Sequence, residues 1–212
     1  MELTHDVLTQ IAVRWLKRPF SGRGPGCHVA LGEIGSYGFN TGEVADAFGY
    51  RYDRWLPGSV LVECKTSRSD FLADAAKPHR NGGKAGVGTY RYYMAPEGVI
   101  GLDDLVGTKW GLLTVNGRGH VRVESGHIAG MILSNMTGAE WVRYWAHDQV
   151  NSEREMMYLA HALRRVGDPQ EMISLRRLAD RQERQIEQLK RDLNRYQSRE
   201  LLDGILDSLP EV

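Results

Sequence analysis

Glu63 and Lys65 are the residues of this sequence whose types and spacing most directly suggest chemistry. They end the run SVLVECK, whose apolar and β-branched residues predict a strand over 59–65. Side chains alternate along a strand, so Glu63 and Lys65 project from the same face as Leu61. The opposite face carries three apolar side chains, those of Val60, Val62 and Cys64. Burying a carboxylate and an ammonium is costly unless they meet a metal ion, each other or water, so the pair indicates a functional site.

Further carboxylates precede this strand and are candidates for the same site. Asp46 comes just before the strand-like segment AFGY, and Glu33 lies in the apolar run that begins at Cys27, with Glu43 as an alternative to Glu33. Mg²⁺ prefers oxygen ligands and keeps several waters, so converging carboxylates could hold the ion against a phosphate. Such an ion lowers the pKa of bound water and stabilises the transition state, while a lysine can position or deprotonate that water. These residues therefore predict metal-dependent hydrolysis of phosphodiester bonds.

The elements that must position these residues follow from apolar periodicity and turn residues. The first helix begins after Thr4 as its N-cap and ends before Pro19, and Ser69 is the expected cap of the second helix. Asn116 and Gly117 form the strongest turn signal in the chain. In chain order, the patterns predict a helix, strands over 27–34, 46–53 and 59–65, a helix from 69 to about 78, a strand over 91–96 and a hairpin over 110–125.

Glu33, Asp46, Glu63 and Lys65, in this element order, resemble the active-site signature of the PD-(D/E)XK nuclease superfamily. The resemblance implies an α+β, restriction-endonuclease-like fold in which a mixed αβββαβ sheet is flanked by helices. It also implies that Asp46 and Glu63 are metal ligands, Lys65 is the catalytic lysine and Glu33 is a supporting acid. The implied cofactor is Mg²⁺, for which Mn²⁺ would substitute. Ala45 stands where the motif has proline, at a turn position that takes no part in the chemistry.

The stretch from Glu33 to Arg91 is also similar to small phage and prophage proteins of this fold, which are related to MmcB-like proteins assigned to DNA repair. Some of these proteins carry an adenylosuccinate synthase label, but this sequence has no glycine-rich phosphate loop after its first strand. The resemblance implies a Mg²⁺-dependent deoxyribonuclease, an endonuclease acting in phage DNA processing or repair. The alternative is a catalytically silent module of the same fold that binds DNA or protein and recruits a partner through a coiled coil.

Basic residues that follow the motif predict a DNA-binding surface, because lysine, arginine and histidine side chains donate to backbone phosphates. The candidate DNA-binding residues are Arg68, Lys77, His79, Arg80, Lys84 and Arg91. An alternative stays open for the second helix, in which Arg68 and Lys77 pair with acids of their own helix, Asp70 and Asp74. The neighbouring tyrosines, Tyr90, Tyr92 and Tyr93, are expected to be core residues of a strand.

The nuclease-like domain is expected to span residues 1–130, followed by a helical region over 131–212. Its last helix, over 174–206, carries apolar residues at three-four spacing, which indicates a coiled coil and a homodimer or higher oligomer. These residues are Ile186, Leu189, Leu193 and Tyr196. The step from Leu178 to Ile186 breaks the heptad, so a single solvated or back-packed helix stays open as the alternative.

Composition limits the class of protein without deciding it. The chain has 212 residues, of which 42% are apolar, and its 27 basic residues balance its 27 acidic ones, as in ordinary globular proteins. Zero net charge neither supports nor excludes nucleic acid, because local positive charge is what binds phosphates. The two cysteines lack the spacing of a zinc site. The N-terminus resembles neither a signal peptide nor a membrane span, so we expect a cytoplasmic protein of the bacterial host cell that does not bind membranes.

Overall fold

The computed structural model describes residues 1–34, 44–53, 56–75, 85–129 and 138–206. The chain forms two compact units, Met1–Ala162 and Leu163–Val212. In the first unit, the helices are α1 (His5–Lys17), α2 (Arg68–Ala75), α4 (Gly138–Trp145) and α5 (Ser152–Val166), which runs into the second unit. The strands are β1 (Val29–Ile34), β2 (Ala45–Arg51), β3 (Gly58–Cys64), β4 (Tyr90–Pro96), β5 (Trp110–Val115) and β6 (Val121–Ser125). The second unit contains α6 (Pro169–Leu206).

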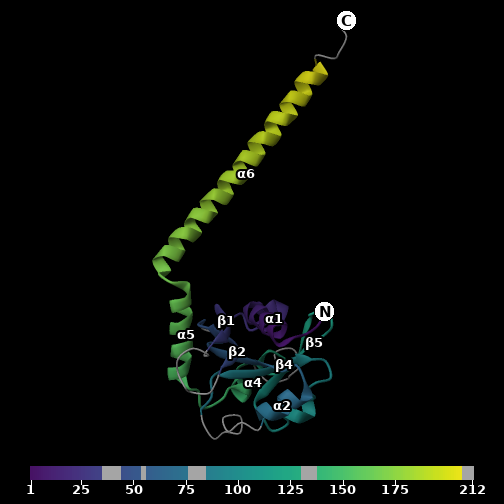
Figure 1. Cartoon of the computed structure of the whole chain (residues 1–212), viewed down its shortest axis with the longest axis vertical. Helices are drawn as coiled ribbons and strands as arrows, with labels where there is room; N and C mark the ends of the chain where they lie inside the picture. The colour runs from purple at the N-terminus through teal and green to yellow at the C-terminus, as the bar shows by residue number, and fades with distance from the viewer. Residues whose placement is uncertain (35–43, 54–55, 76–84, 130–137, 207–212) are drawn as a thin grey trace. The chain divides into compact units, whose positions relative to one another are not determined.

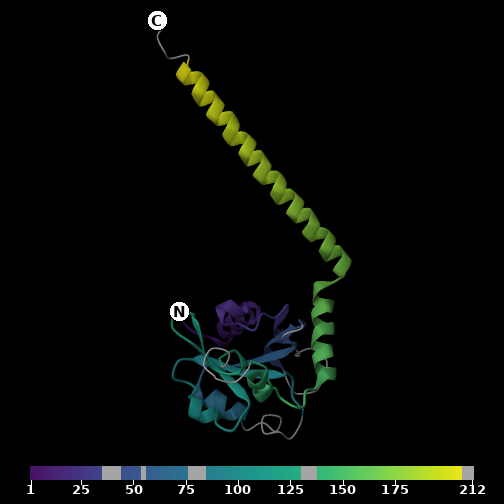
Figure 2. The ribbon, with the colours of Figure 1, turned by 180° about the vertical axis from the view of Figure 1, so that it is seen from behind.

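The six strands form one mixed sheet in the order β1-β2-β3-β4-β5-β6. β3 pairs in parallel with β4, and β4 with β5, while the other neighbours are antiparallel. α1 covers one face of this sheet and α2 packs on the other (Figures 1 and 2). The α+β class, the predicted order of helices and strands, and the hairpin of β5 and β6 are therefore confirmed.

The central strand β3 contributes to a hydrophobic cluster on each side of the sheet. Val60, Val62 and Cys64 pack in the cluster beneath α1. Leu61 packs in the other cluster, together with Phe71 of α2. The predicted alternation of faces along SVLVECK is therefore confirmed, and it leaves Glu63 on the face that α2 covers.

α1 buries one stripe of its surface, as its apolar spacing predicted. Thr4 caps the helix, because its Oγ1 accepts a hydrogen bond from the Val7 amide at 3.4 Å. The buried apolar residues of the stripe are Leu8, Ile11, Ala12, Trp15 and Leu16. Burying a Leu- or Trp-sized side chain contributes roughly 2–3 kcal/mol. This packing fixes the N-terminal turn of α1, and with it His5, beside Asp46 at the start of β2.

The predicted cap of the second helix is wrong by two residues. α2 begins at Arg68 rather than after Ser69, because Ser67 Oγ accepts the Asp70 amide at 3.2 Å. α5 is capped by Asn151, whose Oδ1 accepts the Arg154 amide at 3.0 Å. Serine and asparagine are both strong caps, so local preference alone did not separate neighbouring candidates.

The first compact unit includes most of α5, which is bonded to the sheet. Glu155 is buried, and its Oε1 accepts from Ser59 Oγ at 2.6 Å and from the Gly88 amide at 2.8 Å. Tyr158 packs edge-on against Phe48. Within the described part of the chain, every helix is too short or too polar to cross a lipid bilayer.

A buried histidine makes the stability of the first unit depend on pH. Tyr92 Oη accepts the Ile128 amide at 3.1 Å and shares a hydrogen bond with His127 Nδ1 at 2.9 Å. Burial, reinforced by the Arg51 charge, lowers the pKa of His127 to about 3. Burial also lowers the pKa of His147 to about 4.

We expect the free energy of unfolding to fall as the pH drops from about 6.5 towards 3, because the unfolded chain takes up protons that the folded chain refuses. One such proton gives a slope of up to about 1.4 kcal/mol per pH unit. His127→Gln should flatten this slope, whereas the same substitution at the exposed His120 should leave it unchanged. Urea titrations between pH 4 and 7 measure the free energy of unfolding at each pH. Identical slopes for wild type and His127→Gln would show that His127 is not the source of the pH dependence.

Candidate active site

The candidate site lies where β3 ends and the chain turns into α2. β3 and β4 are parallel at this point, and the Lys65 amide donates to the Met94 carbonyl at 2.9 Å, which extends their pairing past Cys64. Ligands of open α/β sheets bind beyond the carboxyl ends of their strands. The fold therefore places Glu63 and Lys65 at an edge of the sheet where binding sites are common.

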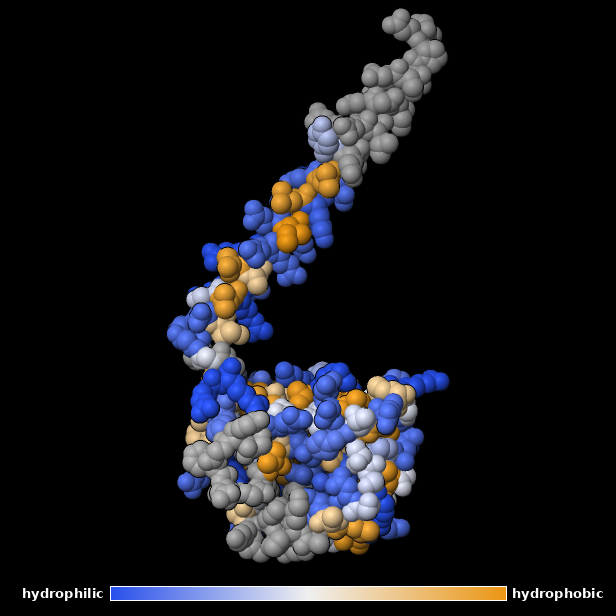
Figure 3. Space-filling view, in the orientation of Figure 1, coloured by the Kyte–Doolittle hydropathy of each residue, from blue (hydrophilic) through white to orange (hydrophobic). Residues whose placement is uncertain are grey.

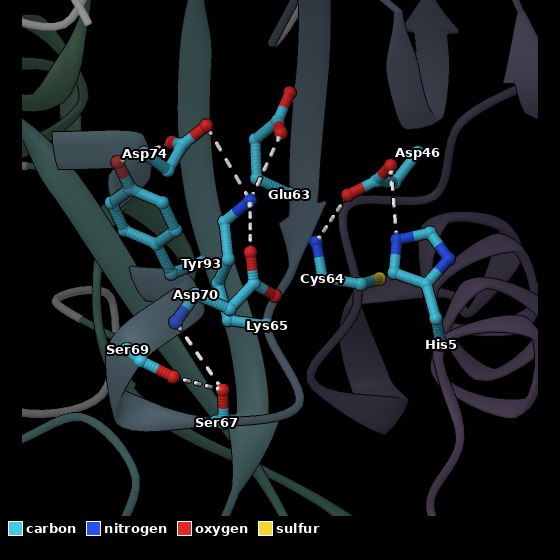
Figure 4. Close-up of polar contacts among 10 residues, drawn as sticks. All are labelled: His5, Asp46, Glu63, Cys64, Lys65, Ser67, Ser69, Asp70, Asp74 and Tyr93. Atoms are coloured by element: carbon cyan, nitrogen blue, oxygen red, sulfur yellow. Dashed lines mark hydrogen bonds and ion pairs between the residues drawn. The ribbon is translucent and has the colours of Figure 1, made fainter. Parts of the chain in front are cut away.

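Lys65 is surrounded by carboxylates, only one of which belongs to the predicted motif. Its Nζ lies 3.8 Å from Glu63 Oε2, 3.9 Å from Asp70 Oδ1 and 3.4 Å from Asp74 Oδ1 (Figure 4). Glu63 and Lys65 are only 3% and 6% exposed. Ion pairs removed from water interact strongly, so this arrangement fixes the position of the ammonium group.

Asp74 is the most deeply buried acid around Lys65, at 2% exposure. Tyr93 Oη donates a hydrogen bond to Asp74 Oδ2 at 3.0 Å. The Tyr93 ring itself is held by Phe71, edge-on at 5.1 Å, and by Trp110, stacked at 4.4 Å. A chain of contacts thus connects the hydrophobic core through Tyr93 and Asp74 to the Lys65 ammonium.

Asp46 flanks Cys64 from the neighbouring strand. Its Oδ2 accepts the Cys64 amide at 2.8 Å, just beyond the last backbone pair of β2 and β3, Ala47 with Val62. Its Oδ1 lies 3.2 Å from Nε2 of His5, at the start of α1 (Figure 4). Asp46 on β2 and Glu63 on β3 therefore lie on adjacent strands, and both are next to Cys64. Asp46 bonds the Cys64 amide, and Glu63 precedes Cys64 in the chain. In this arrangement Asp46 faces α1, while Glu63 faces Lys65.

Glu33 lies in a different group, with His5 and Asp6. Potential ligand atoms of these three exposed residues lie within 4.8 Å of one another. Glu33 follows Gly32, which pairs with Ala47 of β2, and its φ of 49° is in the left-handed region that a non-glycine residue rarely adopts. The group borders a groove of about 530 Å³ between α1 and β1. Exposed acids often cluster without a metal, so the group does not establish Glu33 as a supporting acid.

Carboxylate oxygens are the donors that Mg²⁺ prefers, and Asp46 and Glu63 supply them from neighbouring strands. The Asp46 side chain is 15% exposed and that of Glu63 is 4% exposed. The donor chemistry therefore fits the metal that the resemblance implies, with Asp46 as the more accessible of the two. Glu43, the alternative acid, lies outside the described residues.

The predicted DNA-binding residues have different outcomes. Arg91 is buried and donates to three carbonyls, those of Gly86, Gly88 and Gln149, at 3.0–3.2 Å. It supports the backbone before β4, so its assignment as a phosphate contact is wrong. The positive charge of an arginine reveals neither burial nor partners, which is why the sequence misled. Lys77, His79, Arg80 and Lys84 lie outside the described residues.

Arg68 is half exposed but is bound to an acid of the short 3-10 helix Leu102–Leu105. Its guanidinium forms a two-pronged contact with Asp104, in which Nη2 lies 2.6 Å from Oδ1. The Arg68 hydrogen bond lowers the pKa of Asp104 to about 2. The alternative in which Arg68 pairs with acids of its own helix is therefore wrong, because Asp70 and Asp74 face Lys65 instead.

Sequence reasoning did not assign His5, Asp74 or Tyr93 to the site. Asp70 and Asp74 are four residues apart on the helix after the motif, so helical spacing alone could have placed both on one face. Tyr93 pairs with Glu63 in the register of β3 and β4, which only the sheet reveals. The expectation that Tyr90, Tyr92 and Tyr93 are core residues is confirmed.

Comparisons with known proteins do not assign the chain to a family. No protein-family model matches the sequence, and no curated protein is similar to it. The structure is similar to that of SPO1766, a protein of unknown function from Silicibacter pomeroyi, with 17% identity and a TM-score of 0.47. The match covers 78% of this chain and 91% of that one. This likeness carries no argument about function.

We expect Asp74→Asn to lower the free energy of unfolding by about 2 kcal/mol, because it removes the nearest charge from a buried ammonium while Glu63 still compensates in part. Asparagine can still accept the Tyr93 hydrogen bond, so the change isolates the charge. Asp70→Asn, at a partly exposed acid facing the same lysine, should cost less than about 1 kcal/mol. Urea denaturation at pH 7 compares the two, and equal losses would show that Asp74 does not anchor Lys65.

Proposed function

We propose that the protein is a metal-dependent nuclease that hydrolyses DNA phosphodiester bonds, with its active site at the carboxyl end of β3. The observation that carries the proposal is the buried Glu63–Lys65 pair, with Nζ 3.8 Å from Oε2 and Asp46 on the adjacent strand. A carboxylate and a lysine placed two residues apart on a strand match the chemistry needed to hold a metal and a nucleophilic water. Endonucleolytic action in phage DNA processing or repair belongs to this proposal through the family resemblance.

Each residue has a role in the proposed reaction. Asp46 and Glu63 would hold Mg²⁺ or Mn²⁺, which supplies Lewis acidity towards the phosphate and the attacking water. Lys65 directs its ammonium at the reacting phosphate or the water, where positive charge stabilises the transition state. Asp74 orients Lys65 without touching substrate. His5 contacts the Asp46 carboxylate, so it would restrain one of the two carboxylates proposed to bind the metal.

Phosphate contacts would come from residues near this edge of the sheet. Arg68 is half exposed and bonded to Asp104. A DNA phosphate that binds Arg68 would therefore have to compete with the Asp104 carboxylate. The four basic residues of 77–84 remain candidates from their sequence alone. Positive charge beside the motif would hold the DNA backbone irrespective of its sequence.

Cleavage is tested with the full chain on linear, nicked, branched and single-stranded DNA in Mg²⁺ or Mn²⁺. We expect Lys65→Met to reduce the rate on the order of 100-fold, because the variant loses a charge aimed at the reacting phosphate. Lys17→Met, the same substitution at an exposed position of α1, is the matched control and should keep full activity. If wild-type protein cleaves none of these substrates, the nuclease proposal is wrong.

Metal binding is tested separately by titrating Mn²⁺ into the protein by calorimetry. We expect Asp46→Asn to weaken binding on the order of 10-fold or more, because a neutral amide is a poorer ligand than a carboxylate. The substitution keeps an oxygen for the Cys64 amide, so the strand ends are preserved. Asp6→Asn, in the exposed group around Glu33, is the control and should change affinity little. The reverse ranking would move the metal to the α1 side of the sheet.

The second candidate is a catalytically silent module of the same fold that binds DNA or protein. The observation in its favour is that protein groups already engage both acids, since the Cys64 amide and His5 contact Asp46 and Lys65 contacts Glu63. Mn²⁺ affinity separates the two candidates. A silent module would bind no metal at Asp46, so Asp46→Asn would not change its Mn²⁺ affinity.

A further inference from the structure

α6 exposes apolar side chains over most of its length. Side chains are described from 170 to 196, and Figure 3 shows apolar residues along this part of the helix. Six of them are between 47% and 64% exposed, namely Met172, Leu175, Ile186, Leu189, Leu193 and Tyr196. A helix of this length gains little from its polar residues alone, and an exposed apolar stripe favours association.

The six residues share one heptad register, with Ala179 and Gln182 filling its middle. Met172, Ala179, Ile186 and Leu193 are seven residues apart and occupy the a positions. The d positions, three residues after each, are Leu175, Gln182, Leu189 and Tyr196. The predicted break between Leu178 and Ile186 therefore disappears, because Leu178 lies beside the seam at a g position. One unbroken a/d seam runs from 172 to 196.

We propose that α6 pairs with α6 of a second copy of this chain in a parallel, in-register, two-stranded coiled coil. The heptad pattern supplies knobs for the a and d layers along the whole seam. A β-branched residue at a followed by leucine at d, as in Ile186 and Leu189, favours two strands over higher oligomers. This inference does not rest on the proposed nuclease activity.

Gln182 decides the register and orientation, because it is the only amide in the seam from 172 to 196. In a parallel, in-register pair the two Gln182 side chains occupy the same d layer and can hydrogen-bond to each other. In an antiparallel pair overlapping over the same residues, a packs against d, and Gln182 would face Ile186. A buried amide without a partner costs roughly 1–3 kcal/mol, so the parallel arrangement is preferred.

The charges beside the seam favour the same arrangement. In the parallel pair, g of one helix faces e of the next heptad on the other, which sets Glu171 against Arg176 as an ion pair. The other g–e contacts from 178 to 197 contain no like charges. In the antiparallel pair, e faces e, so Arg176 would face Lys190 and Glu183 would face Glu183. Two like-charge contacts oppose that orientation, and none opposes the parallel one.

The oligomeric state of the full chain is tested by sedimentation equilibrium across a range of concentrations. We expect a dimer that Ile186→Asp converts to monomer, with the dissociation constant raised on the order of 100-fold or more, because a carboxylate would be buried in an a layer. Ile173→Asp is the matched control, since Ile173 is an exposed isoleucine of the same helix at a b position. It should stay dimeric. Circular dichroism confirms that both variants remain folded.

Orientation is tested with Gln182→Cys under mild oxidation. We expect a disulfide-linked dimer, because only the parallel, in-register pair places position 182 against itself. Cys27 and Cys64 are buried, and wild-type protein serves as the control for their reactivity. A monomeric wild type, a dimer indifferent to Ile186→Asp, or a dimer that position 182 fails to cross-link would each overturn the proposal. A monomeric wild-type protein would indicate that α6 packs on its own chain or stands alone.

Discussion

A lysine ammonium buried at the end of a central strand needs negative charge around it, and the first unit of this protein is organised to supply that charge. Glu63 comes from the same strand, and Asp70 and Asp74 come from the helix that follows. An unpaired ammonium in such a place would destabilise the fold by several kcal/mol. The turn from β3 into α2 is therefore constrained by electrostatics as much as by packing.

Hydrophobic packing holds this charged cluster in place. Tyr93 stands between Phe71 and Trp110 in the core and bonds Asp74 with its hydroxyl. The Asp74 carboxylate can therefore move little, and Lys65 moves little with it. Rigid support of this kind is typical of sites where a charged group must meet a substrate without reorganising. It is the physical reason for placing Lys65 at the centre of the proposed active site.

Asp46 and Glu63 make their contacts on opposite sides of the sheet. Asp46 accepts the Cys64 amide and is held by His5 on the α1 side, while Glu63 faces α2 and Lys65. α6 belongs to the second compact unit, and its proposed pairing with a second chain is independent of these acids.

Much of the site was determined by the sequence itself, because strand alternation is a local property. The pattern of SVLVECK placed Glu63 and Lys65 on one face, and apolar spacing located α1 and the six strands in the correct order. The heptad of α6 is likewise local, once Ala179 and Gln182 are read as part of the seam. Neither required knowledge of distant contacts.

Only the tertiary structure decided which charged residues meet. Arg91 carries the same charge as a DNA-binding arginine, but the fold buries it against three carbonyls. Asp74 reaches Lys65, and Arg68 reaches Asp104, because α2 packs on a particular face of the sheet. His5 reaches Asp46 because α1 covers the opposite face. Such pairings depend on how elements far apart in the chain pack together, and composition, periodicity and spacing carry no information about that.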